Sequence, residues 1–317
     1  MSGLENSRSL LYRSVYKAHA SLPSFIHPLQ RGEHYHPFFI IGSGRSGNTL
    51  LRRMLHNHSN LYIPPETYVI GSVIKKFVKH PWYSWGRKVQ MVYETIESYP
   101  EFHTFNLSGL SELTEKVSNC TSSKRSMAYI LNAFYEFYRE KNEIAAQRWG
   151  DKTPINTDYL FEIEKTFPDA RFIHLIRDPY DTIYSYKKAG LYGDIEAAAD
   201  RWGQSVTAAL SLKSGDHNYF ELEYERLVSS PEPCVRDICQ YLGIAFESKM
   251  LGSLETEDHL GDVETLRHHA NVKNPINTKS IGKGHRELAP SEITQINARL
   301  KAFNNDRIEK YLIVTSA

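Results

Sequence analysis

The sequence predicts an α/β fold in which a mainly parallel central sheet is flanked by helices, with a P-loop-like turn beside its first strand. Short apolar runs of strand length, at 38–41 and 171–176, alternate with longer stretches of helical periodicity, which is the pattern of such a sheet. A glycine-rich turn follows the first run, where ligands of open α/β sheets bind. With 317 residues, 41% hydrophobic and 24% charged, the chain has ordinary globular composition.

The elements follow one another in an order that suits one domain. We expect residues 1–36 to be a polar, histidine-rich lead-in and residues 37–317 to form a single domain. Its first half is expected to hold a strand at 38–41, a turn and helix ending near 57–60, a short strand at 61–63, helices with loops over 69–105 and two helices over 108–147. Its second half is expected to hold a polar loop at 148–154, a helix at 156–166, a strand at 171–176, helices at 180–189 and 194–213, a strand at 219–222, a helix at 231–242, a loop at 274–286 and a helix at 290–303.

The turn from Gly42 to Thr49 is a candidate phosphate-binding loop, and three interpretations of it compete. Its glycines match the dinucleotide fingerprint, and Glu66 lies near the place where that fold has an acid for the ribose. The turn also matches a Walker A loop in which Asn48 replaces the lysine that meets the phosphates. We favour the third interpretation, in which Arg45 supplies the charge, because its planar fork of donors fits a phosphate or sulfate.

A second anion site is predicted at the end of the strand at 171–176. Arg177 follows this apolar strand directly and needs an anionic partner, for which Asp178 is the local alternative. The helix that comes next presents Ser185. Both candidate sites lie at the carboxyl ends of strands. Two phosphate sites on one nucleotide suggest a bisphosphorylated adenosine rather than ATP.

At these residues the chain resembles the sulfotransferase family, which moves a sulfuryl group from 3′-phosphoadenosine-5′-phosphosulfate (PAPS). It is most similar to the branch that includes protein-tyrosine sulfotransferases and many bacterial enzymes. Four pieces match in the family's order: the loop at 45–50, Glu66 with Thr67, the segment 151–154 and the segment 280–288. Asn48 departs from the Thr or Ser that is more common in the family, but its backbone N–H remains.

The resemblance implies an in-line displacement at sulfur, with a hydroxyl on a carbohydrate, glycolipid or small metabolite as acceptor. It implies that Glu66 is the general base, with His56 and His58 as rival candidates, and that Arg45 and Lys152, helped by Ser280, stabilise charge on the leaving phosphate. The residues that it implies for PAPS binding are Gly44, Arg45, Ser46, Gly47, Asn48, Thr49, Leu50, Arg177, Ser185, Tyr224, Lys283 and Gly284.

Other functions remain as alternatives: a nucleotide or metabolite kinase with an altered P-loop, a protein that binds adenosine bisphosphate without chemistry, and a sulfotransferase that acts on a tyrosyl hydroxyl. The net charge of +1 does not call for nucleic acid, and the three cysteines have neither disulfide nor metal spacing, so we expect a cytoplasmic protein without a metal. We see no membrane span and no signal peptide. A basic amphipathic helix at 8–17 is a candidate for peripheral membrane contact, and the oligomeric state is left open.

Overall fold

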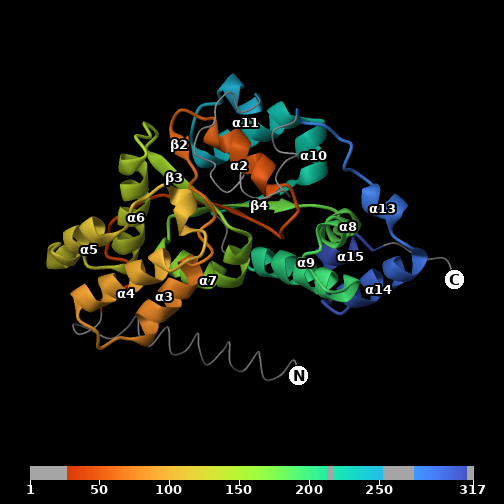
Figure 1. Cartoon of the computed structure of the whole chain (residues 1–317). Helices are drawn as coiled ribbons and strands as arrows, with labels where there is room; N and C mark the ends of the chain where they lie inside the picture. The colour runs from red at the N-terminus through yellow and green to blue at the C-terminus, as the bar shows by residue number, and fades with distance from the viewer. Residues whose placement is uncertain (1–26, 213–217, 253–274, 313–317) are drawn as a thin grey trace. The chain divides into compact units, whose positions relative to one another are not determined.

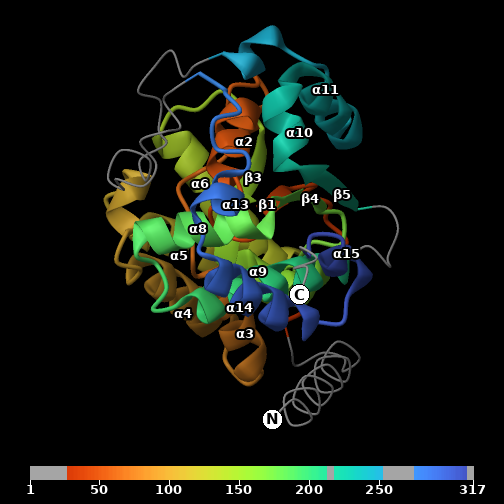
Figure 2. The ribbon, with the colours of Figure 1, turned by 90° about the vertical axis from the view of Figure 1, so that its right-hand side faces the viewer.

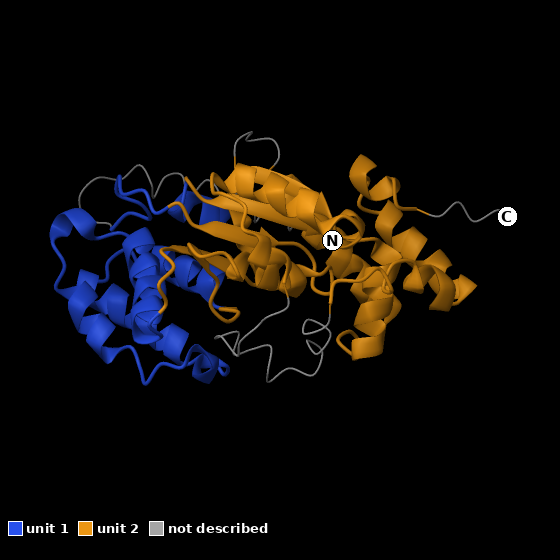
Figure 3. Cartoon of the chain, turned by 90° about the horizontal axis from the view of Figure 1, so that it is seen from above, with its two compact units in different colours: residues 1–35, 69–143, 161–168 blue, residues 36–68, 144–160, 169–317 orange. Residues whose placement is uncertain are grey.

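The structure is a computed structural model that describes residues 27–212, 218–252 and 275–312 (Figure 1). The basic helix expected at 8–17 lies outside these residues. The chain divides into two compact units, each built from several stretches of sequence (Figure 3). Unit 1 comprises residues 1–35, 69–143 and 161–168, and unit 2 comprises residues 36–68, 144–160 and 169–317.

Unit 2 contains a five-stranded sheet in which all four pairings are parallel. Its strands are β1 (Phe38–Ile41), β2 (Leu61–Tyr62), β3 (Arg148–Lys152), β4 (Arg171–Ile176) and β5 (Tyr219–Glu223). Their order is β2-β3-β1-β4-β5, so β1 lies at the centre, with Phe38 opposite both Gly150 and Arg171. The predicted fold class is confirmed. Because the strands are parallel, their carboxyl ends share one edge of the sheet.

The expectation of a polar loop at 148–154 was wrong, because residues 148–152 form strand β3 between β2 and β1. Gly150 explains how this polar sequence fits inside the sheet. A Cβ atom there would come within 2.3 Å of the Phe38 ring, so only glycine leaves room for it. The polar pair Asp151 and Lys152 is buried at the carboxyl end of the strand, where it serves the site described below.

Helices cover both faces of the sheet in unit 2 (Figures 1 and 2). The helices of unit 2 are α2 (Asn48–His56), α8 (Pro179–Ala189), α9 (Ile195–Leu210), α10 (Tyr224–Ser229), α11 (Pro231–Leu242), α13 (Lys283–Glu287), α14 (Pro290–Lys301) and α15 (Asp306–Glu309), with short 3₁₀ segments η3 (Pro154–Tyr159) and η5 (Ser248–Leu251). The last residues of the loop expected at 274–286 therefore belong to the short helix α13. The helix expected at 156–166 begins as η3 and continues as α7 (Leu160–Thr166).

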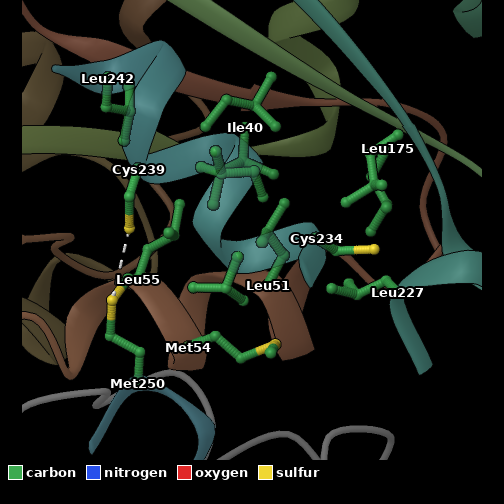
Figure 4. Packing of buried hydrophobic residues seen from close by; sticks show 14 of the residues in the cluster. Ile40, Leu51, Met54, Leu55, Leu175, Leu227, Cys234, Cys239, Leu242 and Met250 are labelled. Atoms are coloured by element: carbon green, nitrogen blue, oxygen red, sulfur yellow. Dashed lines mark hydrogen bonds between the residues drawn. The ribbon is translucent and has the colours of Figure 1, made fainter. Parts of the chain in front are cut away.

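Strand β4 shows how the core of unit 2 forms on the two faces of the sheet. Its side chains alternate, so Ile173 and Leu175 pack with α2, α10 and α11, whereas Ile176 packs with α8, α9 and α14. Figure 4 shows the first of these clusters, in which the sulfur atoms of Cys239 and Met250 lie 3.7 Å apart. The packing holds α2, and with it the glycine-rich turn, against the centre of the sheet.

Unit 1 is helical in its described part, as expected for 69–105 and 108–147. Its elements are α3 (Ile70–Lys79), α4 (Trp85–Glu97), η1 (Phe102–Phe105), α5 (Ser111–Ser118), η2 (Ser122–Lys124), α6 (Met127–Lys141) and all but the first residue of α7. Aromatic side chains such as Phe77 and Tyr93 are buried between these helices, and the Tyr93 hydroxyl donates to the Ile130 carbonyl (2.8 Å). In the part of the chain that the structure describes, no helix is both long and apolar enough to cross a membrane.

Candidate active site

The turn after β1 has the backbone of an anion-binding loop. Gly42 (φ 142°) and Gly47 (φ 94°) have positive φ angles, and so does Arg45 (φ 63°), which few side chains tolerate. Helix α2 then begins at Asn48 without a side-chain cap and with no acid in its first turn. A helix that starts in this way directs its N–H groups and the positive end of its dipole at an anion.

Asn48, which stands where a Walker loop has lysine, has a structural contact in this turn. Its side-chain amide donates to the Ser43 carbonyl (3.0 Å) and closes the loop, while its own side-chain oxygen is buried without a hydrogen-bond partner in the described structure. The Ser43 and Ser46 hydroxyls lie 2.7 Å apart. The turn is thus held by its own short side chains.

The remaining loop residues pack on neighbouring helices. Gly44 faces the Tyr186 hydroxyl of α8, where a Cβ would come within 3.0 Å, and Gly47 faces the Tyr224 ring, where it would come within 2.3 Å. Leu50 packs against the apolar cluster of Figure 4. Bulk at either glycine would move the loop.

Glu66 and Lys152 form a buried ion pair at one end of this loop. Lys152 is the last residue of β3, and Glu66 follows β2; because the two strands are parallel neighbours, their ends meet. The side chains of both residues are almost fully buried. The Lys152 ammonium donates to the Glu66 carboxylate and lies 3.4 Å from the Thr49 hydroxyl at the start of α2. A proton acceptor and a cation thus lie beside the loop.

A polar network holds the segment that carries Glu66. The Thr67 hydroxyl donates to Asp151 (2.9 Å), and the Thr67 N–H donates to the Thr153 hydroxyl (3.0 Å). The Asn156 amide donates to the other oxygen of Asp151 (2.6 Å). Asp151 had no predicted role of its own. The one indication of a role for Asp151 in the sequence is that this carboxylate directly precedes Lys152 at the end of a strand.

The two rival histidines both make structural contacts. The His56 imidazole accepts the Ile63 N–H (3.2 Å), and its neighbour Arg52 donates to the Ile63 carbonyl (3.1 Å). His58 accepts the Asn60 N–H (3.0 Å) on one ring nitrogen and bonds the Ala245 carbonyl (2.9 Å) on the other. These contacts occupy His58 on both nitrogens.

Arg177 organises a second, cationic cluster at the other side of the loop. Its guanidinium donates to the Arg45 carbonyl (3.0 Å) and the Ser280 carbonyl (2.9 Å), and it lies over the Tyr224 ring (4.6 Å to the centroid). The Tyr224 and Ser280 hydroxyls are 2.8 Å apart. The Nε atom of Arg177 is buried and has no hydrogen-bond partner among the described residues. It is a donor without an acceptor inside the cluster.

Arg45 completes this cluster and bonds the serine that was predicted with Arg177. Its Nε atom donates to the Ser185 hydroxyl of α8 (3.1 Å). Burial, and beside it the positive charge of Arg177, lower the pKa of the Arg45 guanidinium. Two cations close together in a buried place favour a bound anion, because an anion offsets both the desolvation and the repulsion.

The alternative that Asp178 is the anionic partner of Arg177 was wrong, because the Asp178 carboxylate bonds other groups. The Asp178 carboxylate accepts the Asp181 N–H (2.9 Å), which caps α8, and bonds the His285 ring (2.9 Å). The acid nearest Arg177 among its ion pairs is Asp181, at 3.8 Å.

Asp181 also clamps the segment that carries Ser280 and Lys283. Its two carboxylate oxygens accept the N–H groups of Gly282 and Gly284, each at 2.7 Å. Gly284 lies so close to the Tyr180 carbonyl that a Cβ would come within 2.1 Å of the oxygen. Lys283, the first residue of α13, is exposed. Asp181 was not among the residues predicted from the sequence; its position four residues after Arg177 was the available signal.

We expect Asp181→Asn to weaken the binding of adenosine 3′,5′-bisphosphate by about tenfold or more. The amide would face one of the two glycine N–H groups with its own N–H group, and a lost charge-assisted hydrogen bond costs roughly 1.5–3 kcal/mol. Calorimetric titration measures the affinity. Asp237→Asn, on the exposed Arg226–Asp237 pair of helices α10 and α11, is the matched control. An unchanged affinity in Asp181→Asn would show that the clamp does not position the site.

In the described ranges no three His, Cys, Asp or Glu side chains are grouped so that they would hold a metal ion. All the chemistry-bearing residues predicted from the sequence lie in unit 2, and the structure brings eight of them into two groups. Glu66 and Lys152 form the first with Thr49, and Arg45, Arg177, Ser185, Tyr224 and Ser280 form the second.

A parallel sheet whose first strand ends in such a loop, between an acid–lysine pair and a buried arginine cluster, defines an α/β protein that binds a nucleotide-like anion. The family model described as "Sulfotransferase family" matches residues 37–248. The chain therefore belongs to the sulfotransferase family, and it is an enzyme of that family.

Relatives and solved structures agree with this family. A protein of Aquifex aeolicus is 25% identical over 297 residues, 90% of this chain and 35% of that protein, so the chain spans about a third of that relative's length. Protein-tyrosine sulfotransferase 2 of Gallus gallus is 24% identical over 275 residues, which are 83% of this chain and 66% of that protein. The sulfotransferase domain of the Synechococcus PCC 7002 olefin synthase has the same fold, with a TM-score of 0.58 and 24% identity over 87% of this chain and 98% of that one.

Proposed function

We propose that the protein transfers a sulfuryl group from PAPS to the hydroxyl of an acceptor. The proposal rests on one observation: the Glu66–Lys152 pair and the Arg45–Arg177 cluster both lie at the start of helix α2. Glu66 and Lys152 lie beside the start of α2 at Thr49, and Arg177 contacts Arg45 within the loop. The residues fit a nucleotide with two anionic ends. The start of α2 and Arg45 suit one end, and the Nε atom of Arg177, a buried N–H group without a partner in the described structure, suits the other.

Each end of the donor has its own residues in this proposal. The N–H groups at the start of α2, together with Arg45, hold the 5′ end, and Arg177 with Ser185 holds the 3′-phosphate. Tyr224 and Ser280 hold Arg177 in place through the ring contact and the carbonyl bond. When it is bound, PAPS supplies a sulfuryl group on a good leaving phosphate.

Glu66 takes the proton of the acceptor hydroxyl in this mechanism. A hydroxyl is a poor nucleophile unless a positioned base removes its proton. In the structure, Lys152 donates to Glu66, so the two charges compensate each other. An anion at the loop attracts Lys152 toward the phosphate side, where Thr49 already lies within 3.4 Å. Lys152 then stabilises the developing charge, and Glu66 is released to act as base.

The acceptor is proposed to carry its hydroxyl on a carbohydrate, a glycolipid or a small metabolite. A tyrosyl hydroxyl is the second candidate, because the relatives from Gallus gallus and Danio rerio are named protein-tyrosine sulfotransferases. Labelled PAPS with a tyrosine-containing acidic peptide in one arm and hydroxylated lipids and sugars in the other separates the two. All three cysteines are free thiols, which supports the cytoplasm as the proposed location.

The donor class is tested by calorimetric titration with adenosine 3′,5′-bisphosphate, with ATP as control and without magnesium. We expect the bisphosphate to bind and ATP to bind at least about tenfold more weakly, since ATP leaves Arg177 and Ser185 without a 3′-phosphate and one lost charge-assisted bond costs this much. Binding of ATP alone would favour a kinase with an altered P-loop. Tight binding of the bisphosphate with no transfer to any acceptor would favour a protein that binds the nucleotide without chemistry.

A further inference from the structure

Unit 1 carries an exposed aromatic turn that the sulfotransferase site does not use. The turn joins α3 to α4, and we define the tryptophan corner as Lys79, His80, Trp82, Tyr83 and Arg87. The Trp82 side chain is 75% exposed, against 46% for Leu191 and 41% for Tyr68, the other large apolar side chains exposed in the described structure. A single exposed apolar residue is ordinary on a protein surface, so the corner needs a further reason to be a site.

The corner presents Trp82 from an ordered turn. The Tyr83 N–H donates to the His80 carbonyl (3.2 Å), and the His80 ring bonds the Lys76 carbonyl (2.8 Å). The His80 ring lies edge-on to Trp82, with 6.0 Å between centroids. Directly after the turn, Trp85 is buried and donates to the Val117 carbonyl (2.9 Å). Trp85 anchors the turn, while Trp82 points into solvent.

Cations flank the turn on both sides, although Lys75 pairs with Glu162 (3.6 Å) and Lys88 is buried. Residues 67–93 contain five lysines and arginines and no acid. Lys79 is exposed and has no ion pair in the described ranges, and Arg87 meets an acid only at Glu94, at 3.8 Å and with both side chains about half exposed. An ion pair of that kind is weak. Lys79 and Arg87 are therefore available to a partner.

A histidine of the same unit packs against Trp85, the residue that anchors the turn. His27 lies edge-on to Trp85, with 5.1 Å between ring centroids. Burial first, and then the charges of Lys88, Arg125 and Arg31, lower the pKa of His27 to about 4. Three further cations of unit 1 therefore act on a residue that contacts the anchor of the turn.

We propose that the tryptophan corner docks on a lipid surface that carries negative charge. An indole is apolar over its rings and polar at its N–H, so it is stable at the boundary between headgroups and acyl chains. The flanking cations are attracted by anionic headgroups. A protein partner fits less well, because a stable interface needs about 800 Å² on each side and a turn with one exposed indole offers far less. The corner would bring the enzyme to an acceptor or donor pool near a membrane, whatever its acceptor is.

Co-sedimentation with vesicles tests the proposal on the full chain. One set of vesicles is phosphatidylcholine alone, and the other also contains phosphatidylserine. We expect binding to the second set only, weakening as salt is raised. Trp82→Ala should weaken it about fivefold or more, and Lys79→Glu with Arg87→Glu about tenfold or more, since each basic residue near an anionic surface contributes about fivefold. Lys301→Glu, on an exposed site of α14, is the matched control and should bind like the unchanged protein.

Three outcomes would overturn the proposal: no binding to either set, equal binding to both, or binding that survives the substitutions in the corner. The last result would assign the contact to another segment, such as residues 8–17. Thermal unfolding of each variant shows that the fold is retained. The assay needs neither PAPS nor an acceptor, so its result does not depend on the proposed sulfuryl transfer.

Discussion

Replacing Glu66 by glutamine should reduce turnover by about a hundredfold or more, which is the usual contribution of a general base. Glutamine keeps the size of the side chain and an oxygen for Lys152, but it cannot take up the acceptor's proton. The affinity for adenosine 3′,5′-bisphosphate should stay within about threefold, because the nucleotide contacts come from the loop and the Arg177 cluster. Transfer from labelled PAPS at saturating acceptor measures the turnover, and calorimetry measures the affinity.

His56→Gln and His58→Gln test the two rival candidates for the general base by the same kind of substitution. Both histidines accept a backbone N–H near β2, at Ile63 and Asn60, so their loss should lower the unfolding temperature more than the turnover. The proposal for Glu66 fails if Glu66→Gln turns over normally while one of the histidine variants loses activity.

Arg177→Ala should weaken adenosine 3′,5′-bisphosphate by roughly 10- to 100-fold, since a lost charge-assisted hydrogen bond costs about 1.5–3 kcal/mol. Adenosine 5′-phosphosulfate has no 3′-phosphate, so its affinity should change by less than about threefold. The contrast between the two ligands, measured by titration of the same variant, identifies which phosphate Arg177 meets.

Arg177 also holds two backbone carbonyls, so a control for general damage is needed. Arg226→Ala removes an exposed arginine of α10 that pairs with Asp237, and it should affect neither ligand. Arg177→Lys keeps the charge and should recover part of the bisphosphate affinity, but not the fork of donors. If both ligands lose affinity equally in Arg177→Ala, the residue supports the loop and does not read the 3′-phosphate.

The sequence was most informative where a pattern is local. The apolar run before the glycine-rich turn predicted β1, the amphipathic pattern after it predicted α2, and the run at 171–176 predicted β4 to the residue. The prediction from the sequence failed at 148–152. The residues there are polar, and they form strand β3 because β1 and β2 both pair with them. That residues 37–317 act as one domain remains a prediction, beside the two compact units that the structure shows.

The sequence alone indicated the chemistry that we propose, because the candidate anion loop, the arginine after β4 and the acid after β2 are each recognisable from their neighbours. Only the tertiary structure decided how these groups meet. Glu66 and Lys152 are separated by 86 positions, and parallel pairing of β2 with β3 joins them. Asp181 holds Gly282 and Gly284 from more than 100 positions away. Contacts of this kind depend on strand order and close packing, which no local pattern in the chain encodes.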